Sequence, residues 1–174
     1  MKSEIASKDA VRQLLICRHA KSSWQDGDLS DFARPLNKRG ERDAPEMGRR
    51  LLLRGIHPDL ILTSPATRAQ STAAHYAAQL GCAPGVLQLN PDQYAATAST
   101  LLTMLQGLQP QMRTVLLVGH NPESTVLANA LGGLAIDNIP TSGVVALEFA
   151  LDSWRDLAVG KGTLLFFDFP KNHG

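Results

Sequence analysis

Short apolar runs, each followed at once by the signals of a helix, constrain the fold of this 174-residue chain more than any other feature. Runs this short, rich in Leu, Ile and Val, are typical of buried strands. Strands that alternate with helices favour an α/β domain with a mostly parallel central sheet. The predicted strands are Val11–Cys17, Asp59–Thr63, 86–89, Thr114–Val118, Val144–Phe149 and Thr163–Phe169.

The predicted helices rest on capping residues and apolar spacing. One runs over 38–54 with Asn37 as its N-cap. Pro45 lies inside it, and an interior proline loses one hydrogen bond and clashes with the preceding turn, so we expect a kink or a later start. Ser64 is predicted to cap the next helix, with a proline at the first helical position. Further helices are predicted over 94–108 and from Asn121, as N-cap, to Gly132.

Length and composition favour a single domain over 11–170, preceded by a loose tail over residues 1–10. The formal net charge of +1 gives no reason to expect a nucleic-acid or membrane partner. The polar N-terminus lacks the apolar core of a signal peptide, so we expect a cytoplasmic protein. Cys17 and Cys82 fit neither a disulfide framework nor a metal pattern, and we expect two buried, reduced thiols.

Positively charged and imidazole side chains stand where three predicted strands end. Arg18 and His19 follow the first strand, Arg68 lies in the first turn of the helix after the second, and His120 follows Thr114–Val118. The carboxyl ends of parallel strands open onto one edge of a sheet, where ligands bind in open α/β folds. We therefore expect two arginines and two histidines to converge in one crevice.

This group of residues suits phosphoryl transfer. Guanidinium forks bind phosphate oxygens in pairs, and helix N-termini near Ser64 and Asn121 would add N–H donors. A histidine of ordinary pKa is largely neutral at pH 7, and its lone pair can attack phosphorus. Because arginines can neutralise the transferring group, we expect neither a metal nor another cofactor.

Each residue also has an ordinary structural interpretation. A histidine at a strand end can bond to backbone, an arginine in a first helical turn can lie on the surface, and single-residue patterns are weak evidence. Only the joint occurrence at three strand ends supports a site. The other three histidines lack such a placement and are assigned no role: His57, His75 and His173.

Three motifs in order along the chain resemble those of the histidine phosphatase superfamily, also called phosphoglycerate mutase-like. The resemblance covers about residues 13 to 169 and implies a three-layer sandwich with helices on both faces of the sheet. The first motif and the short chain are similar to the SixA-type phosphohistidine phosphatases. The motifs are Arg18–Trp24, Ser64–Ala73 and Val118–Pro122, with a lesser match at Pro35–Asn37 and Gly40.

The resemblance also implies roles for individual residues. His19 would be the nucleophile that forms a phosphohistidine intermediate, and water would then release phosphate. Arg18, Arg68 and a His120 protonated beside the dianion would surround the phosphoryl group. Gln25 stands where many members place an asparagine that binds phosphate, so it is a candidate substrate-binding residue.

A general acid is not evident in the sequence. Larger members carry a glutamate acid on an inserted segment for which there is no room between Leu89 and Leu108, and Glu123 is better explained as an acidic residue at a helix N-terminus. An acid is worth roughly 10²–10⁴ in rate to a poor alkoxide leaving group, whereas a phosphorylated imidazole leaves more easily. We therefore predict a phosphatase of phosphohistidine-bearing proteins. The alternatives are a broad phosphatase of small phosphorylated molecules and a phosphate-binding module without turnover.

Overall fold

The computed structural model describes residues 10–172 and contains a six-stranded sheet of order β3-β2-β4-β1-β5-β6. The first four strands in this order pair in parallel, whereas β5 is antiparallel to β1 and β6 is antiparallel to β5. The predicted mostly parallel sheet is confirmed, and an antiparallel pair extends one side of it. The strands are β1 (Val11–Arg18), β2 (Leu60–Thr63), β3 (Leu87–Leu89), β4 (Thr114–Gly119), β5 (Val144–Ala150) and β6 (Thr163–Asp168).

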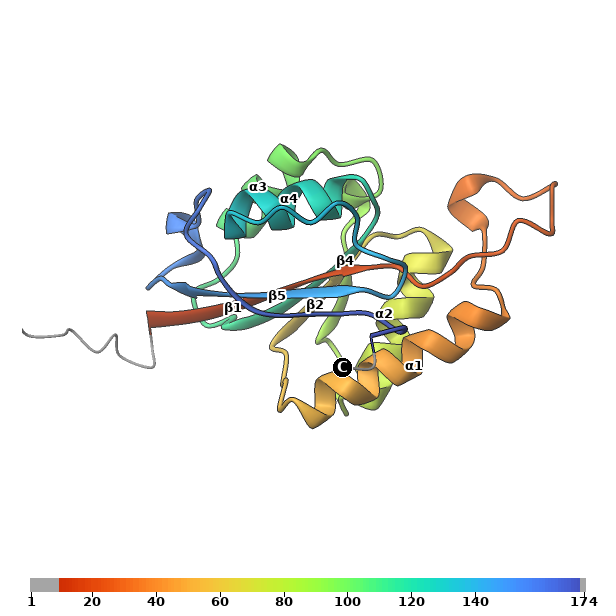
Figure 1. The fold of residues 1–174 in the computed structure, drawn as a ribbon, viewed down its shortest axis with the longest axis horizontal. Coiled ribbons are helices and arrows are strands. Elements are labelled where there is room, and N and C mark those ends of the chain that lie inside the picture. Colours follow the sequence, from red (N-terminus) through yellow and green to blue (C-terminus); the bar gives the residue numbers. More distant parts are fainter. Residues whose placement is uncertain (1–9, 173–174) are drawn as a thin grey trace, which may run out of the picture.

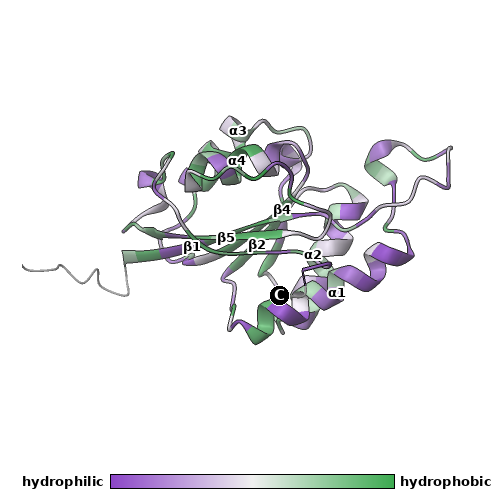
Figure 2. Ribbon diagram, in the orientation of Figure 1, coloured by the Kyte–Doolittle hydropathy of each residue, from purple (hydrophilic) through white to green (hydrophobic). Residues whose placement is uncertain are grey.

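Helices cover both faces of the sheet, as the resemblance implies (Figure 1). Successive side chains of a strand point to opposite faces, and β1 accordingly contributes Leu14 and Ile16 to one apolar core and Leu15 and Cys17 to the other. Figure 2 shows the strands largely hydrophobic and α1 largely hydrophilic on its outer side. α1 (Lys38–Leu53) and α2 (Thr67–Gln79) cover one face, and α3 (Ala98–Gln106) and α4 (Glu123–Gly132) cover the other.

The start of α1 is set by its cap rather than by its proline. The Asn37 side chain accepts a hydrogen bond from Gly40 N at 2.9 Å, and the helix begins at Lys38 as the cap predicts. The later start suggested by Pro45 is wrong. One lost backbone hydrogen bond is outweighed by the capping bond and by the buried face of the helix, which consists of Gly40, Asp43, Ala44, Met47, Gly48 and Leu51.

Three other helices begin later than predicted. α2 begins at Thr67 with Ala66 as N-cap, because Ser64 turns its hydroxyl toward the neighbouring strand end. α3 begins at Ala98, where the Thr97 side chain accepts from Thr100 N. α4 begins at Glu123, after a cis Asn121–Pro122 bond, and the Asn121 side chain donates to the backbone oxygen of Ile139 instead of capping the helix.

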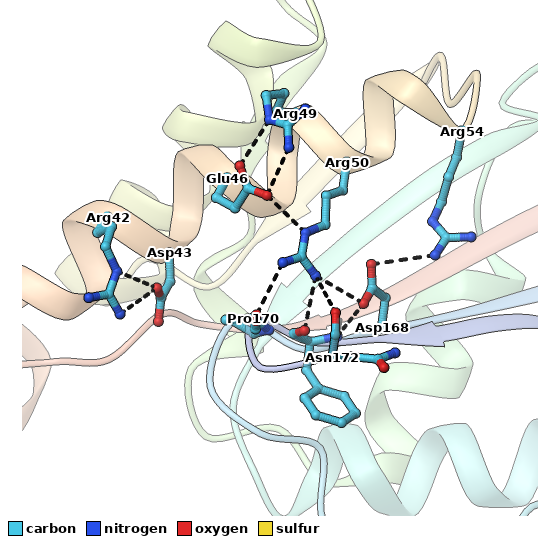
Figure 3. Close-up of polar contacts among 10 residues, drawn as sticks. Arg42, Asp43, Glu46, Arg49, Arg50, Arg54, Asp168, Pro170 and Asn172 are labelled. Atoms are coloured by element: carbon cyan, nitrogen blue, oxygen red, sulfur yellow. Dashed lines mark hydrogen bonds and ion pairs between the residues drawn. The ribbon is translucent and has the colours of Figure 1, made fainter. Parts of the chain in front are cut away.

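Arg50 fastens α1 to the segment that follows β6 (Figure 3). Its guanidinium donates to Asp168 Oδ1 at 3.2 Å and to the backbone oxygens of Phe169, Pro170 and Asn172 at 3.2, 3.1 and 3.1 Å. Hydrogen bonds that involve a charged group are stronger than neutral ones. This one side chain therefore joins the first helix to the last strand of the sheet.

The tail predicted over residues 1–10 lies, apart from Ala10, outside the described residues. No helix within 10–172 is both long and apolar enough to cross a membrane. Cys17 and Cys82 are free thiols, the first buried and the second only partly so.

Candidate active site

The three strand ends lie level with one another, as the parallel topology requires. In the register of the sheet, Arg18 lies opposite Gly119 and Thr63 lies opposite Val118. The next residues are therefore neighbours at the carboxyl edge, and the ring centroids of His19 and His120 are 5.2 Å apart. The predicted convergence of the two histidines is present in the structure.

His19 is 8% exposed, and its two ring nitrogens have different surroundings. Nδ1 lies 2.7 Å from the backbone oxygen of Ala20. A carbonyl can only accept, so Nδ1 carries the proton and Nε2 carries the lone pair. Arg68 is buried beside it, and its Nε donates a hydrogen bond to His19 Nε2 over 3.4 Å. The neutral ring thus directs a nucleophilic nitrogen at a guanidinium group.

Both imidazoles are neutral at physiological pH. Burial lowers the pKa of His19 to about 3, and the charges of His120, Arg68 and Arg18 add to this effect. Burial, followed by the charge of Arg68, lowers the pKa of His120 to about 4. The surrounding arginines already supply positive charge and disfavour a second cation there. The expectation of a protonated His120 concerns the site with a phosphoryl dianion bound, and it stays a prediction.

Two polar atoms of the site are buried and have no hydrogen-bond partner among residues 10–172. They are Arg18 Nε and His120 Nδ1. Arg18 is held by Nη1, which donates to the Ile139 oxygen at 2.9 Å, and His120 is held by Nε2, which lies 2.8 Å from Ser64 Oγ. Buried polar groups are normally paired, so these two atoms are open positions in an otherwise fixed arrangement.

The loop between β1 and α1 brings to the site residues that the sequence reasoning missed or left unused. Asp31 accepts from Arg68 Nη2 at 3.0 Å through its carboxylate and from Arg68 Nη1 at 2.6 Å through its backbone oxygen. Arg34 and Tyr94 also donate to this carboxylate, at 3.0 and 2.6 Å. The position of Arg34 directly before the matched segment that begins at Pro35 was an available signal, whereas nothing in the pattern around Asp31 or Tyr94 marked either residue.

A close approach of two backbones fixes the base of this loop. Asn37 N donates to the backbone oxygen of Lys21 at 3.0 Å, and a Cβ on Gly40 would lie only 2.2 Å from that same oxygen. Only glycine fits there. The first turn of α1 thus packs directly on the residues that follow His19.

The two weaker site predictions have different outcomes. Gln25 is exposed and lines a hollow with Pro35, and the described structure records no hydrogen bond from its side chain to His19, Arg68 or His120, so its role stays a prediction. Glu123 does lie near the site, because it lines a small hollow together with His120, Gly119 and Tyr94.

Carboxylates and histidines are not arranged for metal binding in the described part of the chain. Within 10–172, no group of three or more His, Cys, Asp or Glu side chains could hold a metal ion.

A hollow of about 640 Å³ lies elsewhere, along the outer side of α1, and is lined by Arg39, Arg42, Arg49 and Lys171 among others.

Residues 14–93, which include His19 and Arg68, match the model of the histidine phosphatase superfamily (branch 1). An uncharacterized chloroplastic protein of Arabidopsis thaliana is 34% identical over 161 residues, which cover 86% of this chain and 72% of that protein. The chain belongs to the histidine phosphatase superfamily. An uncharacterized protein of Mycobacterium tuberculosis is 32% identical over 88% of this chain and 99% of its own length.

Solved structures place the chain in the SixA-type branch of this superfamily. A structure from Agrobacterium tumefaciens, provisionally described as phosphohistidine phosphatase SixA, matches with a TM-score of 0.78 and 27% identity, covering 91% of this chain and 98% of that one. The protein histidine phosphatase SixA complexed with tungstate has the same fold, with a TM-score of 0.77, 23% identity, and coverage of 91% and 97%. These comparisons support phosphatase activity for this superfamily member.

Proposed function

We propose that this protein is a phosphatase of phosphohistidine-bearing proteins that works through a phosphohistidine intermediate on His19. The observation that carries the proposal is the hydrogen bond from His19 Nδ1 to the Ala20 oxygen, which leaves Nε2 as a neutral nucleophile beside Arg68. A buried nucleophile kept neutral by its surroundings is ready to react at physiological pH.

Three further residues bind the phosphoryl group in this proposal. Arg68 neutralises its charge, and the unpaired Arg18 Nε donates to one of its oxygens. Ser64 Oγ already accepts a hydrogen bond from Ala66 N at 3.2 Å, so its O–H can donate a hydrogen bond to His120 Nε2. His120 Nδ1 then carries an N–H for a second phosphoryl oxygen. The dianion would in turn favour protonation of His120.

The choice of substrate follows from the protonation state of Asp31, the carboxylate that pairs with Arg68. Hydrogen bonds from Tyr94, Arg34 and Arg68 hold the pKa of Asp31 well below its usual range. An ionised Asp31 has no proton to give to a leaving alkoxide, whereas a phosphorylated imidazole that is protonated from solvent on its other nitrogen leaves as a neutral ring and needs no acid from the enzyme. This supports phosphoramidates over phosphomonoesters as substrates, with Glu123 kept as the alternative acid.

A rate comparison tests the proposal. The substrates are a phosphohistidine-bearing protein, a sugar phosphate and an aryl phosphate at equal concentrations. We expect the first to be hydrolysed fastest, with a phospho-enzyme trapped by rapid denaturation at alkaline pH, where the P–N bond survives. Faster hydrolysis of the two esters would favour a small-molecule phosphatase, and the absence of both turnover and phospho-enzyme would favour a binding module.

The remaining proposals concern the setting of this site. Residues 11–170 would act as one domain, in the cytoplasm, without metal or other cofactor and without a nucleic-acid or membrane partner. Turnover should survive exhaustive dialysis against EDTA. A loss of activity that added Mg²⁺ or Zn²⁺ restores would contradict the metal-free mechanism.

A further inference from the structure

The carboxylate of Asp31 accepts hydrogen bonds from three side chains, two of which are arginines. Oδ2 accepts from Arg68 Nη2 at 3.0 Å and from Tyr94 Oη at 2.6 Å, while Oδ1 accepts from Arg34 at 3.0 Å. Yet its side chain is 49% exposed, so it is fixed in place and still open to a ligand. It lies in the 3-10 turn Asp31–Ala33, on the loop that projects beyond the end of the sheet (Figure 1).

The guanidinium of Arg68 spans the distance between the nucleophile and this carboxylate. Its Nε points at His19 Nε2, and its two terminal nitrogens point at Asp31. A phosphoryl group attacked by Nε2 and bound along this guanidinium has its leaving group on the side away from His19, because displacement at phosphorus proceeds in line. Asp31 lies at the end of the guanidinium that points away from His19.

We propose that Asp31 is a specificity-determining residue whose carboxylate accepts a hydrogen bond from the leaving imidazole of a phosphohistidine substrate. This rests on the proposed function. In the substrate, one ring nitrogen bonds to phosphorus and the other carries a proton taken from solvent. As the bond from His19 Nε2 to phosphorus forms, the P–N bond breaks and its electron pair goes to the departing nitrogen. The imidazole leaves neutral, and its remaining N–H is the donor to Asp31.

Selectivity follows from the charge of Asp31. An ionised carboxylate stabilises the cationic ring of the bound substrate and repels leaving groups that carry negative charge. The groups that face Asp31 are Arg34, Arg68, Tyr94 and, more distantly, His120, and the two arginines and the phenol all favour its ionised form. Ionised Asp31 therefore cannot protonate the alkoxide that leaves from a phosphomonoester, but it can bind the imidazolium ring of a phosphohistidine substrate.

The variant Asp31→Asn tests this inference, because the amide oxygen can still accept from Arg68 and the backbone contact to Arg68 Nη1 is unchanged. We expect kcat/KM for a phosphohistidine peptide to fall roughly 10–100-fold, the range for loss of a hydrogen bond to a charged group. Hydrolysis of p-nitrophenyl phosphate, whose leaving group is an anion, should not fall and should rise somewhat once the negative charge of Asp31 is removed. Asp28→Asn, an exposed carboxylate on the same loop, is the matched control and should alter neither rate.

The pH profile gives a second readout that a structural role would not move. Since ionised Asp31 favours the protonated ring of the substrate, the alkaline decline of phosphohistidine hydrolysis should begin at lower pH in Asp31→Asn, with the aryl phosphate profile unchanged. Asp31→Glu keeps the charge and should restore part of the preference. Thermal melting shows whether Asp31→Asn is folded. If it is not, the inference still requires that Asp31→Glu has a higher kcat/KM for the phosphohistidine peptide than Asp31→Ala.

Two results would overturn the inference. Equal loss on both substrates in Asp31→Asn would make Asp31 a positioning residue for Arg68, and no loss on either would leave it without a role. Both differ from failure of the proposed function, in which the unaltered protein itself does not hydrolyse the phosphohistidine peptide.

Discussion

His19 has two ring nitrogens, and the surrounding backbone decides which one can react. The contact to Ala20 occupies Nδ1, and burial keeps the ring neutral. Replacing His19 by Gln should abolish both turnover and the trapped phospho-enzyme, because it removes the ring nitrogen to which phosphorus would bond beside Arg68. The matched control is His75→Gln on α2, whose ring pairs with Glu41 at 2.7 Å. A phospho-enzyme trapped with the His19→Gln variant would contradict the assignment of His19 as the nucleophile.

Arg68 should matter almost as much as the nucleophile. Its loss removes the charge nearest to His19 Nε2, and loss of a single donor to an anionic transition state typically costs about 10²–10³ in kcat. The measurement is kcat for Arg68→Ala on the preferred substrate, with the exposed Arg155→Ala as the control. Near-normal turnover in Arg68→Ala would remove it from the site.

The buried histidines should also make stability depend on pH. The pKa values of about 3 for His19 and about 4 for His120 lie below the unfolded value near 6.5, so the unfolded chain binds more protons as pH falls below 6.5. The contribution of each histidine to the free energy of unfolding is fully present above pH 6.5. As the pH falls below 6.5, this free energy decreases by about 1.4 kcal/mol per pH unit for each histidine. Urea unfolding between pH 7 and 5 measures this slope, which should be roughly halved in His120→Asn; an unchanged slope would argue against a neutral His120.

At the scale of elements, the parallel strands made most of the site predictable. Arg18 is the last residue of β1, His19 follows it, and His120 follows β4, and strand ends in a parallel sheet must lie level. The late start of α2 could not be predicted, because it depends on Ser64 turning toward His120. The position of Asp31 could not be predicted either, because it depends on the conformation of the long loop between β1 and α1. The spacing of apolar residues, which predicts helices and strands, does not predict a loop conformation.

The contact between α1 and the loop after His19 gives a prediction at this scale. In Gly40→Ala, the added Cβ would meet the Lys21 oxygen at 2.2 Å, so the helix or the loop must shift. We expect a loss of about 1–3 kcal/mol in the free energy of unfolding, as for other overpacked sites, together with lower turnover. Gly27→Ala is the control, since nothing lies within 4 Å of the position that its Cβ would take, and it should stay within about 0.5 kcal/mol. Equal behaviour of the two variants would refute the steric argument.

At the scale of the whole molecule, the Arg50 contacts connect the first helix with the last strand on the side of the sheet covered by α1 (Figure 3). Arg50→Ala would leave the mostly buried Asp168 with one fewer cation and free three backbone oxygens. We expect a loss of about 2–3 kcal/mol in unfolding free energy, measured by urea denaturation, with kcat/KM unchanged.

The control for this prediction is Arg49→Ala, whose pair with Glu46 lies on the surface. Exposed pairs contribute little to stability, because water and salt screen their charges, so this variant should unfold almost as the unaltered protein does. A similar loss in both variants would mean that general charge on α1, and not the connection to the chain after β6, determines stability.

The bond between the His19 ring and the Ala20 carbonyl has one more consequence, which concerns isomers. Phosphohistidine exists in two forms, with phosphorus on either ring nitrogen. Because Nδ1 of His19 is occupied by the Ala20 oxygen, the phospho-enzyme should be purely the τ isomer, phosphorylated on Nε2. An antibody specific for that isomer should stain the trapped intermediate, and one raised against the π isomer should not.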